Sequence, residues 1–128
     1  MAAHGWPARQ AAARGVARLP ILDANLGVLT HERELELLRA LAVFPDVVEE
    51  AAELRAPHRV ATWVRDFAAR FHGFYRDCRV ISDDAALTQA RLWLAEASRI
   101  GLANALAILG VGAPEEMSRA DDVEPDAE

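Results

Sequence analysis

Histidine, cysteine and neighbouring carboxylates are the side chains from which this chain would build a metal site or acid–base catalysis. Four histidines occur, at His4, His31, His58 and His72. None of them is spaced as a metal-ligand pair, and His72 and Cys78, six residues apart on one expected helix, point in different directions. Glu49 and Glu50 are adjacent and face different ways on a helix. The pattern predicts neither a metal site nor a cofactor.

Motifs for phosphate binding and for nucleophilic catalysis are absent from the sequence. The glycines of Gly110-Val111-Gly112 follow an expected helix, whereas a phosphate-binding loop follows a strand. No serine stands in a nucleophile motif. We therefore expect no catalysis by this chain alone.

Cysteine usage and hydropathy bear on where the protein resides. Cys78 is the only cysteine, which excludes a disulfide within the chain and is typical of a cytoplasmic protein. No apolar run is long enough to span a membrane, and the alanine-rich N-terminus lacks the apolar core of a signal peptide. The sequence predicts a cytoplasmic protein without membrane contact.

The net charge of −6 argues at first against RNA binding. Its distribution changes this argument, because residues 114–128 contain seven of the twenty acidic residues and only one of the fourteen basic ones. That segment carries the whole net charge and leaves the rest of the chain neutral. A neutral body can bind RNA where its arginines cluster on one face.

The spacing of apolar residues predicts an all-α fold, a bundle of four or five helices. The helices are expected over residues 7–19, 30–43, 45–54, 58–78 and 85–109. Thr30 is the expected N-cap of the second helix, and Pro45 is expected to end it and start the third. Asp83 or Asp84 would cap the last helix, and Gly110 would follow its end.

The helix over residues 58–78 has the clearest periodicity. One face carries Val60, Trp63, Val64, Phe67, Phe71, Phe74 and Cys78. This face is expected to be the main contribution to the core. The loop over residues 20–30 contains several apolar side chains and is expected to pack against the domain.

Three motifs in the second half of the chain carry more information than periodicity does. They read FHGFYRDCRV over residues 71–80, ARLWLAEA over residues 90–97 and LANALAILGVGAPEEM over residues 102–117. In this order and spacing they resemble the DALR domain, the C-terminal anticodon-binding domain of arginyl-tRNA synthetases. A weaker resemblance extends upstream, so that the domain is expected over residues 25–117. Residues 1–24 would then form a helix and linker, and residues 118–128 a disordered acidic tail.

The chain departs from the synthetase family in three respects. The nucleotide-binding domain with its catalytic signatures is absent, the helix that usually leads into the domain is degenerate, and the acidic tail follows Met117. Together these departures favour a free-standing paralogue over a fragment cut from a synthetase. Aminoacylation would then require a separate catalytic protein.

The resemblance implies the all-α fold of class I anticodon-binding domains, with tRNA as partner, in particular an arginine acceptor. The RNA-binding residues implied by the motifs are His72, Tyr75, Arg76, Arg79, Arg91 and Met117. Aromatic rings stack on unpaired bases, and arginine both pairs with phosphate and stacks on bases. A synthetase catalytic protein is the second partner that the resemblance implies.

Other interpretations of these residues and of the chain stay open at this stage. Tyr75 could be the edge of the core, His72 a solvated helix residue, and Arg76 and Arg79 ordinary surface charge. The neutral body and acidic tail also fit a protein-interaction or regulatory module that does not bind RNA. Removal of residues 118–128 distinguishes an RNA-binding site that the acidic tail masks from a chain that has no such site.

Overall fold

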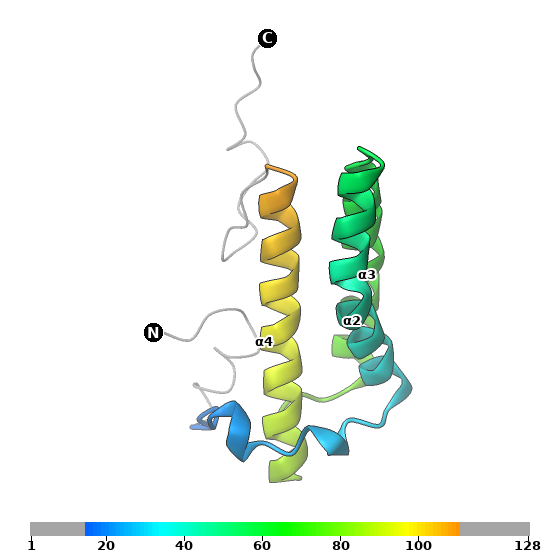
Figure 1. Ribbon diagram of the computed structural model, residues 1–128. Helices are drawn as coiled ribbons and strands as arrows, with labels where there is room; N and C mark the ends of the chain where they lie inside the picture. The colour runs from blue at the N-terminus through cyan, green and yellow to red at the C-terminus, as the bar shows by residue number, and fades with distance from the viewer. Residues whose placement is uncertain (1–14, 111–128) are drawn as a thin grey trace, which may run out of the picture.

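Three long α-helices make up most of residues 15–110, the part of the chain that the computed structural model describes (Figure 1). They are α2 (Glu32–Glu53), α3 (His58–Asp77) and α4 (Ala85–Ile108), preceded by the short 3-10 helices η1 (Ile21–Asp23) and η2 (Leu26–Val28). Residues 15–110 contain no strand, which confirms the all-α class. The number of long helices in this part is smaller than the four or five expected.

Helix α2 accounts for one of the missing helices, because it continues through Pro45. The expected break there is wrong. Proline has no N–H to donate to the carbonyl of Leu41, and a proline inside a helix costs about 3 kcal/mol. Packing offsets this cost: the Phe44 ring lies 4.4 Å from the Trp63 ring, and the Trp63 indole N–H donates to the carbonyl of Ala40 over 3.0 Å.

The start of α2 also differs from the expectation. His31 is the N-cap in place of Thr30: its Nδ1 accepts from the backbone N–H of Arg33 over 3.0 Å. The Glu34 carboxylate accepts from the backbone N–H of His31 over 2.9 Å and completes a capping box. A ring nitrogen thus replaces the hydroxyl that usually fills this position.

Helices α3 and α4 confirm the predictions from periodicity and capping. Asp84 caps α4 by accepting from the backbone N–H of Leu87, and Gly110 follows the helix with a φ of 80°, which favours glycine. The expected face of α3 forms the core: Val60, Phe67 and Phe74 are almost fully buried. Each large side chain on such a face contributes about 1.5–3 kcal/mol on burial.

Residues 15–30 cross the end of the bundle where α4 begins (Figure 1). The Gln89 side chain accepts from the backbone N–H of Leu19 and donates to the carbonyl of Ala17, and the Trp93 indole donates to the carbonyl of Leu19. Arg18 lies 4.3 Å above the Trp93 ring. This segment is held by polar contacts and a cation–π contact on one face of α4.

Some of the predictions for residues 1–30 are confirmed and others are wrong. Residues 15–19 are not helical, so the expected helix does not extend to Leu19. Residues 7–14 and the tail over residues 118–128 lie outside the described residues. Of the apolar loop residues, Leu29 is buried and Val28 packs against the core, but Ile21, Leu22 and Leu26 are exposed.

Candidate RNA-binding surface

The motif residues of α3 lie at the end of the bundle where α2 and α4 begin (Figure 1). Helix α3 ends at Asp77, and Cys78 closes it by donating its backbone N–H to the carbonyl of Phe74 over 2.8 Å. The loop over residues 78–84 then leads directly into α4. Three segments distant in sequence therefore meet at this end.

The structure places the sequence-predicted residues in different environments. His72, Arg76 and Arg79 are exposed, Tyr75 is half-buried, and Arg91 is buried. Met117 lies outside the described residues.

His72, Tyr75 and Arg76 share one side of α3, because residues three and four apart are neighbours on a helix surface. The Tyr75 ring stacks beside Phe71, with centroids 6.5 Å apart and planes inclined by 25°. Phe71 in turn contacts the fully buried Phe74 at 5.8 Å. The tyrosine is thus the outer member of an aromatic row whose inner member belongs to the core.

Asp77 orients two arginines at the end of α3. It accepts from Nε of Arg76 over 3.1 Å and from Nε of Arg33 on α2 over 2.8 Å. These hydrogen bonds, from Arg76 first and then Arg33, lower the pKa of the Asp77 carboxyl below its ordinary value. The carboxylate stays charged at neutral pH, and it leaves much of the Arg76 side chain, 68% of its surface, in contact with solvent.

Gly73 makes the Arg33 contact possible. A Cβ at this position would lie only 2.9 Å from Nη1 of Arg33. The guanidinium therefore crosses α3 directly over the glycine and reaches Asp77. The small residue within the first motif has a positional role that the sequence alone did not indicate.

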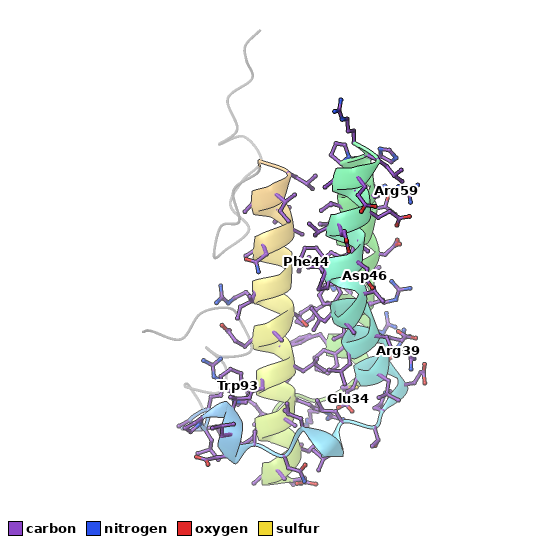
Figure 2. The ribbon with its side chains drawn as sticks, in the orientation of Figure 1. Glu34, Arg39, Phe44, Asp46, Arg59 and Trp93 are labelled. Atoms are coloured by element: carbon purple, nitrogen blue, oxygen red, sulfur yellow. The ribbon has the colours of Figure 1, made fainter. Side chains whose placement is uncertain are left out.

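Arg91 lies inside the molecule, against Glu34. Figure 2 shows Glu34 between α2 and α4. The Nε of Arg91 donates to the Glu34 carboxylate, and its Nη1 donates to the backbone carbonyl of Arg79 over 2.7 Å. The Glu34 side chain is 1% exposed and that of Arg91 is 10% exposed. Both charges are satisfied by protein groups, so Arg91 positions the loop at Arg79 from within the bundle.

The loop over residues 78–84 has further internal contacts. The Thr88 hydroxyl accepts from the backbone N–H of Ser82 over 2.8 Å and donates to its carbonyl over 3.1 Å. Cys78 is buried beneath the loop, and burial raises the pKa of its thiol, which keeps it uncharged. With Arg91 on the Arg79 carbonyl, these contacts fix the backbone from which the exposed Arg79 side chain projects.

Glu34 is a site residue that the sequence reading missed. Its partner is 57 residues away, so no local pattern names the pair. One signal was present: Glu34, Leu37 and Leu41 fall at helical spacing, which places a carboxylate in line with the apolar face of α2. A charge in that position is buried only with a partner.

A groove of about 420 Å³ opens between α2 and α3, and Trp63 is among the residues that line it. Arg39 and Arg70 line it together with Glu32, Glu36 and Asp66, so its charges are mixed. None of the sequence-predicted site residues lines it. The groove is therefore a separate surface from the motif residues.

The described residues hold no group of three or more potential metal ligands among His, Cys, Asp and Glu. Within residues 15–110, no helix has the length and apolar character needed to cross a membrane.

Comparison with known proteins places the motifs in a family context. Residues 9–117 match the family described as the DALR anticodon binding domain. The arginine–tRNA ligase of Carboxydothermus hydrogenoformans is 46% identical over 109 residues, which are 85% of this chain and 20% of that protein. That of Frankia alni is 52% identical over 98 residues, 73% of this chain and 18% of that protein. The chain thus spans about a fifth of the length of these relatives. It belongs to the DALR anticodon-binding domain family.

Proposed function

We propose that this domain binds the anticodon loop of a tRNA, specifically an arginine acceptor, at the end of α3. The observation that carries the proposal is the clustering of His72, Tyr75 and Arg76 on one side of α3, next to Arg79 on a fixed loop. Family membership supports RNA as the ligand, and the names of the relatives support the arginine acceptor.

Each residue has a role suited to its environment. The half-exposed Tyr75 ring, supported by Phe71, offers an unpaired base a surface for stacking. His72 contacts a base edge or the sugar–phosphate backbone, and Arg76 and Arg79 pair with phosphates. Arg91 acts indirectly, by holding the Arg79 backbone. Met117 remains a proposed contact, carried over from the family motif.

Aminoacylation with arginine is the reaction that this binding would serve. The chain corresponds to about a fifth of its relatives, and the remaining four-fifths of a synthetase would supply ATP and arginine binding. A catalytic protein of that kind is the proposed protein partner, and the cytoplasm is the proposed location.

Fluorescence anisotropy with labelled anticodon stem–loops tests the proposal. The wild-type chain should bind a stem–loop with an arginine anticodon more tightly than one of equal length with another anticodon. Tyr75→Ala should weaken binding by about 1–3 kcal/mol per stacked base, whereas Tyr75→Phe should retain most of the affinity. Equal affinity for all anticodons would refute arginine specificity. If neither the full chain nor a chain ending at Met117 binds RNA, the domain is a protein-interaction module.

A further inference from the structure

We infer that the RNA-binding surface continues along the outer side of α3 as a strip formed by Arg65, His72 and Arg76. In this strip, Arg65 binds a backbone phosphate of the stem that adjoins the anticodon loop. The inference rests on the proposed function and extends the proposed RNA-binding surface to Arg65, which lies outside the family motifs. All three residues are exposed.

The spacing of the strip places its residues in line. Arg65, His72 and Arg76 stand at i, i+7 and i+11 on α3, so His72 and Arg76 each lie within about 20° of Arg65, on either side of it, around a helix with 3.6 residues per turn. Between them, Ala68 and Ala69 are exposed and small, which allows a ligand to approach the helix closely.

The acidic residues of α3 do not lie between the residues of the strip. Asp66 lines the groove beside α2. Asp77 follows the last residue of the strip, where it accepts from Arg33 of α2 and from Nε of Arg76. The strip therefore combines positive and neutral side chains without a carboxylate of its own helix at its centre.

Arg65 has no carboxylate partner among the described residues. Its only hydrogen bond there joins Nη2 to the Thr62 hydroxyl at 3.5 Å, the limit for such a bond. Most other arginines of the described part are paired, for example Arg39 with Glu32 and Arg59 with Glu50. No ion pair within residues 15–110 thus has to be broken for Arg65 to bind an anion, only the long hydrogen bond to Thr62.

The distance from Arg65 to His72 along α3 corresponds to a few phosphate spacings in a stacked RNA strand. With a rise of 1.5 Å per residue, Arg65 lies about 10 Å from His72 along the helix axis. Phosphates of one strand of double-stranded DNA are spaced by about 3.4 Å along its axis, and those of an A-form RNA stem are closer. For an RNA strand that runs along α3, Arg65 would therefore contact the backbone roughly three to four nucleotides from the position of His72. That position belongs to the stem if His72 contacts the loop.

Arg70 provides a matched control on the same helix. It too is exposed and lacks a carboxylate within ion-pair distance among the described residues, but it faces the groove that contains Glu36 and Asp66. Arg65→Gln and Arg70→Gln therefore remove the same charge from two sides of α3. Neither substitution removes an ion pair within residues 15–110, so both variants should keep the helical circular dichroism of the wild type.

The test measures the affinity of the full chain for an anticodon stem–loop and for the isolated loop oligonucleotide as a function of salt. Arg65→Gln should weaken binding to the stem–loop about two- to fivefold at low salt, the range of an exposed ion pair, and lower the slope of log K against log salt by about 0.7–0.9. The loss should be equal for all anticodons, absent with the isolated loop, and restored by Arg65→Lys. Arg70→Gln should match the wild type.

The outcomes separate this inference from the function on which it rests. If the wild type binds the stem–loop and Arg65→Gln binds it equally well, the inference fails and the proposed function stands. An equal loss with Arg70→Gln would show a general charge effect and also overturn the strip. If the wild type binds no stem–loop at any salt concentration, the proposed function fails and the strip with it.

Discussion

Arg91 is a buried residue that holds the backbone of the proposed RNA-binding surface from within the bundle. Its guanidinium joins Glu34 of α2 to the backbone carbonyl of Arg79 in the loop after α3, so one side chain connects three segments. The Glu34 carboxylate also closes the capping box at His31. The buried pair therefore fixes the start of α2 and the backbone of Arg79 at the same time.

Arg91→Leu should lower the free energy of unfolding by about 3–5 kcal/mol, because it leaves the Glu34 carboxylate buried without a partner. Urea unfolding followed by circular dichroism measures this change. Arg39→Leu is the matched control, since its pair with Glu32 is exposed and should contribute only about 0.2–1 kcal/mol. A loss in Arg91→Leu no larger than in the control would contradict the assigned role.

The location of Arg91 could not be predicted from the sequence. The DALR resemblance led to the expectation of an RNA contact, but burial depends on a partner on another helix. The exposure of His72 and Arg76 and the half-burial of Tyr75 followed more directly from their offset from the apolar face of α3. The sequence thus predicts which side of a helix is exposed better than it predicts contacts between helices.

At the scale of elements, two helical glycines perform opposite tasks. A Cβ at Gly101 of α4 would lie 2.9 Å from Cδ2 of Leu41 on α2 and 3.6 Å from the buried Trp63 ring. A Cβ at Gly73 of α3 would meet only the far end of the flexible Arg33 side chain. The first glycine lets two helices pack closely, and the second lets a surface guanidinium pass.

Alanine substitution at these two glycines should change stability in different directions. Gly101→Ala should lower the free energy of unfolding by about 1–3 kcal/mol through overpacking of the core. Gly73→Ala should leave it unchanged or raise it, because alanine favours a helix by about 0.5–1 kcal/mol and the ion pair at Arg33 is exposed and screened by solvent. Thermal unfolding of both variants checks the prediction. Stabilisation by Gly101→Ala would refute the close contact with Leu41.

The boundaries of α3 and α4 were predictable because their signals are local. Asp84 and Gly110 mark the ends of α4, and the apolar positions of α3 repeat with the helical period. Pro45 was misread as a helix break because the contact that stabilises α2 there comes from Trp63, which is 23 residues beyond its hydrogen-bond partner Ala40. Local proline chemistry favoured a break, and packing between helices outweighed it.

For the whole molecule, the distribution of charge matters more than its sum. Residues 118–128 contain five acidic residues and one arginine, so their removal changes the formal net charge from −6 to −2. Because phosphate repels carboxylates, the chain ending at Met117 should bind a stem–loop more tightly than the full chain at low salt, and the difference should vanish at high salt, where charges are screened. Anisotropy titrations at several salt concentrations measure this difference in affinity.

A full-length variant with Asn and Gln in place of the five acids is the control for chain length. It should behave like the truncated chain, since charge and not length is the cause. Equal affinity of all three proteins at low salt would show that the acidic segment has no influence on the proposed RNA-binding surface.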